Sequence, residues 1–344
     1  MAPSRRSANI NTVRMAQSQS WIGAILAGRS AGERVRGMWS ATIALFLAVA
    51  WAAGGCSHSE ARVEASRPET PALSYIGEWG TKGDGPGQLD EPTCIATDGV
   101  GKAYIADAGS HFVHKFDTDG TPLLSFQENA LKNPQSITVD SGGAIYVTES
   151  TSGSTFIFFP NGDKYHQVKL KIHANNEDML SVAVDDGGLI QILDAEADRV
   201  FTYTPRFRLT KSWTPDAGEP DVRLHPRAVA AAPDGSVYLL DADAGRVLKF
   251  TSDGHFVNAM KADGGSGRLS DAFAISATGI FAMDADGRTL HAWSVDEQPK
   301  LDMDLASQLG QGSGATPELA VSPRKELLVL DAPESRVLRY RINF

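Results

Sequence analysis

The chain has 344 residues, of which 42% are hydrophobic and 22% charged, and its formal net charge at pH 7 is −10. The length suffices for one large domain or two small ones, and the composition is that of a soluble globular protein. Six Arg and one Glu lie in the first 55 residues, so the remainder carries 26 Lys and Arg against 41 Asp and Glu. This acidic balance argues against nucleic-acid binding, which needs cations to neutralise phosphates.

The N-terminal region reads as a targeting segment. Residues 1–37 are rich in Arg and Ser and have no apolar periodicity, so we expect an unstructured extension. The apolar run from Ala41 to Ala53 is thirteen residues long, too short to span about 30 Å of hydrocarbon but suited to the core of a signal peptide. It lies within residues 38–55 and ends just before Gly54-Gly55-Cys56.

This ending resembles the bacterial lipoprotein signal, in which small residues precede a Cys that becomes lipidated. The resemblance implies a lipid on Cys56 and a membrane partner, followed by a flexible polar tether over residues 56–73. Ser57 follows the Cys, which by the same resemblance permits sorting to the outer membrane. We therefore expect a cell-envelope protein that faces the periplasm, at the outer membrane rather than the inner one. An uncleaved anchor helix and an ordinary signal peptide remain alternatives.

A short hydrophobic run that ends in an acid occurs six times in the rest of the chain. The acids are spaced 42 to 47 residues apart, and an aromatic residue follows nine positions after each of them. They are Asp107, Glu149, Asp194, Asp241, Asp284 and Asp331. A period of roughly 40–50 residues built from short strands indicates a β-propeller with one four-stranded sheet per repeat. We therefore predict an all-β, six-bladed propeller over residues 74–344.

The first strand of each repeat can also be placed. We predict these strands at Thr93–Asp98, Ser136–Asp140, Leu180–Asp185, Ala228–Ala232, Ala272–Ser276 and Glu318–Ser322. A strand at Ser74–Gly80 precedes the first repeat, and the last repeat ends at Phe344 without a fourth strand. Because an open ring would leave exposed sheet edges, we expect the N-terminal strand to complete the last sheet and close the ring.

One segment points to a particular repeat family. Gly87-Gln-Leu-Asp-Glu-Pro92 leads into an alternating run, a Tyr-Ile-Ala-Asp strand and an Asp-Gly turn at Gly120. This pattern resembles the NHL repeat. The fourth repeat matches it in its second half, which contains Arg246-Val-Leu-Lys-Phe250. The resemblance covers about residues 74–344 and implies the propeller fold, which hosts many functions. Cys94, in an apolar run, is expected to be a small buried residue.

The repeated acids and basic residues allow two interpretations. In the structural one, each acid accepts hydrogen bonds from backbone N–H groups in the turn after its strand and pairs with an Arg. In the functional one, basic side chains surround one mouth of the central channel and bind an acidic or carboxylate ligand. The candidates for this role are His111, Arg199, Arg246, Arg288 and Arg336.

The sequence gives little support to a metal site or a cofactor. The Asp-x-Asp-Gly strings, such as Asp284–Gly287, lack the Gly and Glu spacing of a calcium loop and read as turns. NHL propellers include a metal-dependent lyase with His ligands on inner strands, but none of the eight His residues lies in a predicted first strand. No Gly-x-Ser-x-Gly motif is present.

These observations favour a non-catalytic binding or scaffold lipoprotein of the bacterial cell envelope. We expect it to be monomeric, to hold no metal or cofactor, and to bind a protein or an envelope polymer with one face of the propeller. The alternative is a metal-dependent lyase or hydrolase of the NHL-like propeller class.

Overall fold

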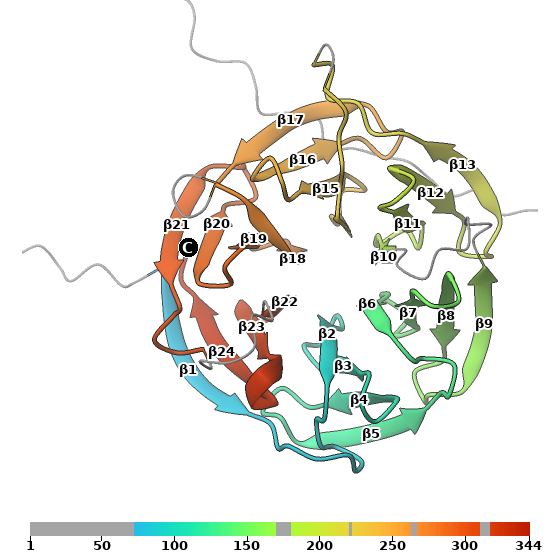
Figure 1. Ribbon diagram of the computed structural model, residues 1–344, viewed down its shortest axis with the longest axis vertical. Coiled ribbons are helices and arrows are strands. Elements are labelled where there is room, and N and C mark those ends of the chain that lie inside the picture. The colour runs from blue at the N-terminus through green and yellow to red at the C-terminus, as the bar shows by residue number, and fades with distance from the viewer. Residues whose placement is uncertain (1–71, 170–179, 220–221, 263–266, 310–316) are drawn as a thin grey trace, which may run out of the picture. The chain divides into compact units, whose positions relative to one another are not determined.

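The computed structural model describes residues 72–169, 180–219, 222–262, 267–309 and 317–344, all within the compact unit Ser66–Phe344. These residues form six four-stranded sheets arranged in a ring around a common axis (Figure 1), and a cavity lies at the centre of the ring. The prediction of a six-bladed, all-β propeller is confirmed. The predicted N-terminal extension, the signal peptide, Cys56 and nearly all of the tether lie outside the described residues. No helix in the described ranges is long and apolar enough to cross a membrane.

Each blade is an antiparallel meander whose strands are named here from the channel outward. Blade 1 is β2 (Pro92–Thr97), β3 (Ala103–Asp107), β4 (Phe112–Phe116) and β5 (Pro122–Gln127). Blade 2 is β6 (Pro134–Val139), β7 (Ile145–Glu149), β8 (Ser154–Phe158) and β9 (Lys164–Lys169). Blade 3 is β10 (Leu180–Val184), β11 (Ile190–Asp194), β12 (Arg199–Tyr203) and β13 (Leu209–Trp213).

The second half of the ring repeats this order. Blade 4 is β14 (Ala228–Ala231), β15 (Val237–Asp241), β16 (Arg246–Phe250) and β17 (Phe256–Lys261). Blade 5 is β18 (Leu269–Ser276), β19 (Gly279–Asp284), β20 (Thr289–Trp293) and β21 (Pro299–Asp304). Blade 6 is β22 (Glu318–Ser322), β23 (Glu326–Asp331), β24 (Arg336–Ile342) and β1 (Leu73–Trp79), with a short 3-10 helix, η1 (Ala332–Glu334), before β24.

The hydrophobic core lies between neighbouring blades rather than at one centre. Every residue of β3, β7, β11, β15 and β23 is buried, whereas the outermost strand β9 is almost wholly exposed. One cluster joins Ile95 and Ile105 of blade 1 to Leu328 and Val337 of blade 6. Both faces of each sheet are therefore covered, which explains the continuous apolar runs in the second strands.

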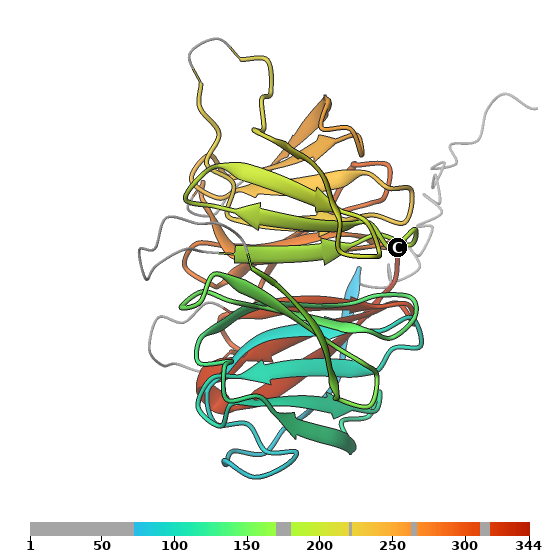
Figure 2. The same ribbon diagram turned by 90° about the vertical axis from the view of Figure 1, so that its right-hand side faces the viewer.

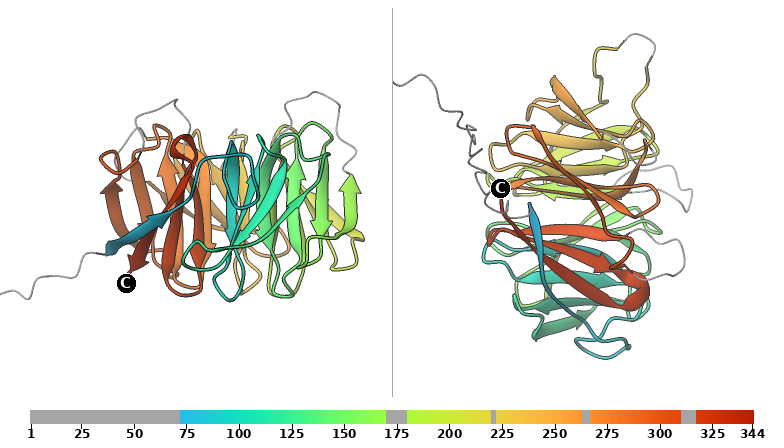
Figure 3. Two further views of the ribbon diagram at one scale, coloured as in Figure 1. Left: turned by 90° about the horizontal axis from the view of Figure 1, so that it is seen from below. Right: turned by 90° about the vertical axis from the view of Figure 1, so that its left-hand side faces the viewer.

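The first strand closes the ring, as predicted. β1 pairs antiparallel with β24 from Leu73↔Ile342 to Trp79↔Val337, with a bulge between Tyr75 and Gly77. Figure 3 shows β1, coloured blue, lying against the red strand of the last blade. The N-terminal strand thus covers the edge that β24 would otherwise expose.

An aromatic residue on the outermost strand packs over a turn glycine of the following blade at three blade junctions. A Cβ added to Gly120 would lie 2.2 Å from Trp79, one on Gly162 would lie 2.6 Å from Phe126, and one on Gly254 would lie 2.7 Å from Trp213. Each of these glycines has φ between +81° and +89°. Only glycine fits here, because both the backbone and the space exclude a side chain.

At the junction of blades 2 and 3 the arrangement is reversed: the smaller side chain is on the outermost strand and the aromatic one is in the turn. Val168 pairs with Thr155 at the strand position that Phe126 and Trp213 occupy in their blades. The matching turn position holds Phe207, with φ of +59°. Its ring packs on the Val168 cluster and stacks on His166 with centroids 4.4 Å apart. The large side chain has thus moved from the strand to the turn.

We expect Val168→Trp and Phe207→Gly to be strongly coupled. Val168→Trp alone should lower the free energy of unfolding by about 1–3 kcal/mol through overpacking. Phe207→Gly alone should lower it by about 1 kcal/mol or more, because the lost ring contacts outweigh relief of the positive φ. The loss in the double variant should be smaller, by at least about 1 kcal/mol, than the sum of the losses in the two single variants. Urea denaturation of the unaltered protein and the three variants measures these losses. If the losses of the two single variants simply add in the double variant, the side chains at 168 and 207 do not compensate for each other and the prediction is wrong.

Candidate functional site

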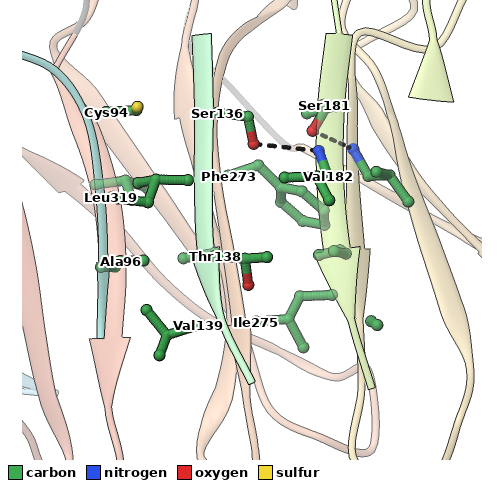
Figure 4. A pocket seen from close by; sticks show the side chains of 18 of the residues that line it. Cys94, Ala96, Ser136, Thr138, Val139, Ser181, Val182, Phe273, Ile275 and Leu319 are labelled. Atoms are coloured by element: carbon green, nitrogen blue, oxygen red, sulfur yellow. Dashed lines mark hydrogen bonds between the residues drawn. The ribbon is translucent and has the colours of Figure 1, made fainter. Parts of the chain in front are cut away.

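A cavity of about 640 Å³ lies at the centre of the propeller. Residues on its wall come from all six innermost strands, β2, β6, β10, β14, β18 and β22, and from their ends. Figure 4 shows part of this wall at close range. A cavity of this volume is in the range of small-molecule pockets.

Neighbouring innermost strands run in the same direction, since Gln135 and then Ser136 of β6 accept hydrogen bonds from Leu180 N and then Val182 N of β10. Val182 N of blade 3 donates to Ser136 Oγ of blade 2 at 3.2 Å (Figure 4). Thr97 Oγ1 of blade 1 donates to Val321 O of blade 6 at 2.8 Å. Equivalent positions therefore lie side by side, and the innermost strands begin at one end of the channel. We call this end the start mouth and the opposite one the end mouth.

Three charged residues meet at the start mouth. Asp271 lies on β18, Glu318 is the first residue of the neighbouring β22, and Arg227 directly precedes β14. All three line the cavity, and Arg227 is exposed. The two carboxyl groups come from adjacent blades, which places like charges near each other in a confined space.

Burial perturbs the Glu318 carboxyl most strongly. Desolvation, with a smaller contribution from the negative charge of Asp271, raises its pKa to about 8. Protein surrounds the group on most sides, although the channel leaves part of its surface accessible. No described residue forms a hydrogen bond or ion pair with its carboxyl. Glu318 is therefore mostly protonated at neutral pH and can exchange a proton there.

Asp271 differs from Glu318 in having a positive neighbour. Desolvation raises its pKa, the charge of Arg227 opposes that shift, and the charge of Asp243 adds to it. Asp243 in turn forms an ion pair with Arg268. Asp271 thus has the positive charge of Arg227 nearby. For Glu318, Asp271 is the one charged group among the described residues that shifts the pKa.

An ion pair and a hydrogen bond, both to Asp198, hold the segment that leads to Arg227. Arg223 bonds Asp198 Oδ2 at 2.6 Å, and His225 Nδ1 lies 3.1 Å from Asp198 Oδ1. Asp198 is 1% exposed and has φ of +49°, so the turn after β11 is shaped around this contact. Figure 1 shows the segment, coloured yellow, crossing from the rim toward the channel, and Figure 2 shows the preceding part projecting from the disc.

Below the charged residues, the wall becomes apolar on the blade 5 side. Asp271, Phe273 and Ile275 are partly accessible, while the alternating Ala272 and Ala274 are buried. Since side chains alternate along a strand, the first three share the face of β18 that lines the channel. Figure 4 shows Phe273 and Ile275 at successive levels of the channel wall.

The end mouth carries acids that are already used in turns. Asp98 accepts hydrogen bonds from the backbone N–H groups of Val100 and Lys102 at 3.0 and 2.9 Å. Asp185 accepts one from Leu189 N at 2.8 Å. The end mouth therefore offers fewer unsatisfied groups to a ligand than the start mouth does.

The basic residues predicted to surround the channel do not line it. Arg246 bonds Asp241 at 2.9 Å and Glu219 at 2.6 Å, and Arg336 bonds Asp331 at 3.0 Å and Glu78 at 2.8 Å. The other three basic residues also lie at or just before third strands. Arg199 donates hydrogen bonds to Ser212 Oγ, and His111 Nδ1 lies 3.0 Å from Leu131 O. Arg288 is exposed. None of the five lies on the cavity wall.

The six repeated acids follow the structural interpretation. All are buried, with exposed fractions of 4% or less. Asp107 accepts backbone hydrogen bonds from Asp90, Glu91 and Ser110, and Glu149 accepts them from Asn133, Thr151 and Ser152. They fix the turns at the start-mouth face, on which the channel opens.

Cys94 and the histidines are also placed. Cys94 is 3% exposed, is not in a disulfide and lies on the channel wall, so the prediction of a small buried residue is confirmed. Among the described strands, His114, His166 and His291 lie on β4, β9 and β20, away from the innermost strands. No three His, Cys, Asp or Glu side chains of the described residues group closely enough to hold a metal ion.

The fold defines the class of this protein: a six-bladed β-propeller with a channel site. No family model and no curated protein sequence matches the chain. Solved structures do. A streptogramin B lyase superposes with a TM-score of 0.58 at 11% identity, covering 80% of this chain and 100% of that one. Virginiamycin B lyase from Staphylococcus aureus gives 0.56 at 10% identity, with coverages of 79% and 100%.

A third structure is a catalytically inactive form of virginiamycin B lyase from Staphylococcus aureus with quinupristin. It gives a TM-score of 0.53 at 10% identity and covers 73% of this chain and 80% of that one. At such identities the likeness extends to the fold alone.

Three charged residues of the cavity, Arg227, Asp271 and Glu318, were not identified from the sequence. The repeat drew attention to residues that recur in every copy, whereas these three occupy strand starts that differ between blades. A signal was present: Glu318 begins a predicted innermost strand, where an acid has no backbone role that the repeat requires.

Proposed function

We propose that this protein is a non-catalytic binding lipoprotein of the bacterial cell envelope, anchored through Cys56. Its start-mouth face holds a protein or envelope polymer that inserts an end group into the channel. The observation that supports this most is the unpartnered Glu318 carboxyl on the wall of a 640 Å³ cavity. The cavity reaches this carboxyl, so a donor group of a ligand that enters the channel can form the hydrogen bonds that the described residues do not supply.

A lyase or hydrolase is the alternative, and one observation favours it. A carboxyl with a pKa of about 8 can accept and return a proton near neutral pH, as a general acid–base does. Two propellers of similar fold are, by their names, a streptogramin B lyase and a virginiamycin B lyase. Incubating the purified protein with virginiamycin B and separating the products by liquid chromatography tests this. Conversion that Glu318→Gln abolishes would replace the binding proposal with the enzymatic one.

Site-specific cross-linking in cells tests where the partner binds. Val222 is 46% exposed on the loop that leads to the start mouth, and Val100 is 59% exposed in a turn at the end mouth. With benzoylphenylalanine in place of Val222, irradiation should yield a cross-linked partner, whereas the same replacement at Val100 should not. Cross-links from Val100 only, or from neither position, would overturn the proposal.

The anchor is tested in the same cells. Cys56→Ser should move the protein from the membrane fraction to the soluble fraction, because the lipid chains would be lost. Unchanged membrane association would exclude lipidation at Cys56.

A further inference from the structure

We propose that the start mouth recognises a primary ammonium group attached to an apolar carbon skeleton. Asp271 and Glu318 hold the ammonium group, and Phe273 and Ile275 contact the apolar part. This inference deepens the proposed function and rests on it, because it names the chemistry of the end group that enters the channel.

The two carboxyl groups suit a cation that donates several hydrogen bonds. Ionised carboxylates only accept hydrogen bonds, and an ammonium group offers three donors and no acceptor. Glu318 has no hydrogen-bond or ion-pair partner among the described residues, although protein encloses it and the cavity reaches it. A ligand cation placed between Glu318 and Asp271 would satisfy this carboxyl and allow it to ionise beside the charge of Asp271.

The wall beside the acids selects an apolar skeleton over a bare ion. Phe273 follows Asp271 by two positions on the same channel-lining face of β18, and Ile275 follows by four. An ammonium group held by Asp271 therefore lies near an aromatic ring that can attract a cation. A metal ion would need a third ligand, and no described group of three His, Cys, Asp or Glu residues supplies one.

Binding should be linked to proton release from Glu318. Within the part of the chain that the structure describes, Asp271 is the charged neighbour that shifts the pKa of Glu318. From β2, the Cys94 thiol stays neutral, because burial and the charge of Glu318 raise its pKa to about 12. On β23, Asp331 pairs with Arg336 and Glu326 pairs with Arg339. Arg227 and Asp243 act on Asp271.

The sign of the pH dependence follows from these groups. Without ligand, Glu318 is protonated below about pH 8, and a bound cation favours the ionised form. Affinity should therefore rise with pH, by up to about tenfold per unit between roughly pH 6 and 8, and level off above that range. The ammonium group itself stays charged, because alkylamines titrate near pH 10.

Isothermal titration calorimetry with 2-phenylethylamine tests the inference on the purified protein. Binding should strengthen from pH 6 to 8, and titrations in two buffers of different ionisation enthalpy should show release of close to one proton per amine at pH 7. N-acetylated phenylethylamine should bind at least about tenfold more weakly. Phe-Ala amide against its N-acetylated form then distinguishes a peptide N-terminus from a small amine as the source of the group.

Variants separate the site from the fold. Glu318→Gln keeps the side-chain shape and should abolish both the pH dependence and the proton release, with about tenfold weaker binding. Phe273→Leu should weaken binding at every pH alike. Asp186, an exposed cavity residue that follows β10 at the end mouth, is the control, and Asp186→Asn should change nothing. Equal affinity for the amine and its acetylated form, or a pH-independent affinity in the unaltered protein, would overturn the inference. A positive cross-link at Val222 would then leave the binding function standing with another ligand chemistry.

Discussion

Removal of β1 is expected to lower the free energy of unfolding by roughly half or more. A purified chain that begins at Lys82 lacks the strand pairing from Leu73 to Trp79, where each hydrogen bond contributes about 1 kcal/mol. It also lacks the Trp79 ring, which packs 4.7 Å from Phe116 of blade 1 and whose loss costs about 3 kcal/mol. A typical domain has only about 5–15 kcal/mol in total. Urea denaturation measures the loss.

The shortened chain should also associate, because the edge of β24 becomes exposed and can pair with another chain. Size-exclusion chromatography should show oligomers that a chain beginning at Ser57 does not form. A chain beginning at Ala72 is the matched control, since it keeps β1 and loses only the predicted tether. An unchanged unfolding midpoint in the chain that begins at Lys82 would contradict the role of β1 in closing the ring.

The fold could be predicted from the sequence because every blade repeats the same physical problem. Each second strand is buried on both faces and ends in an acid that caps a turn, as Asp107 and Glu149 do. Such requirements recur with the blade and leave a period in the sequence. Closure was predictable for the same reason, because the last repeat lacked a fourth strand and the predicted strand Ser74–Gly80 belonged to no repeat; β1 fills that place.

The site could not be predicted in this way, because it depends on differences between blades. The innermost-strand position that pairs with the residue before the repeated acid holds Cys94, Ser136, Ser181, Ala228 and Glu318, with no residue type common to all. The arginines of the third strands were predicted as ligand-binding residues instead, because they recur from repeat to repeat. Those residues lie away from the channel, where Arg246 and Arg336 bind buried acids. A residue that breaks the repeat is a better indicator of function than one that obeys it.

The Phe207 turn shows a second limit of the repeat. An Asp-Gly pair marks the outer turn in blades 1 and 4, whereas the same turn in blade 3 has Arg206-Phe207. The structure explains the departure by the small Val168 on the preceding blade, which leaves space that the Phe207 ring fills. The pair lies 39 positions apart by count, so only the packing between blades reveals it.

Asp107→Ala is expected to lower the free energy of unfolding by about 3–5 kcal/mol. Asp107 is fully buried and accepts backbone hydrogen bonds from Asp90 N at 2.7 Å, Ser110 N at 2.9 Å and Glu91 N at 3.3 Å. Each buried donor left without an acceptor costs about 1–3 kcal/mol, with water recovering part of the loss. Asp107→Asn retains one acceptor oxygen and should lose about 1–2 kcal/mol. Denaturant titrations at pH 7 measure both.

Asp194 is the matched control, because it holds the same place in blade 3 with fewer partners. It accepts a backbone hydrogen bond from Ala197 N at 2.9 Å, and burial raises its pKa. A raised folded-state pKa means that its contribution to stability is present below the unfolded pKa, near 4, and is lost as pH rises through the folded one. Asp194→Asn should therefore be neutral or slightly stabilising at pH 7. Equal losses for Asp107→Asn and Asp194→Asn would show that the repeated acids do not stabilise the blades through their backbone hydrogen bonds.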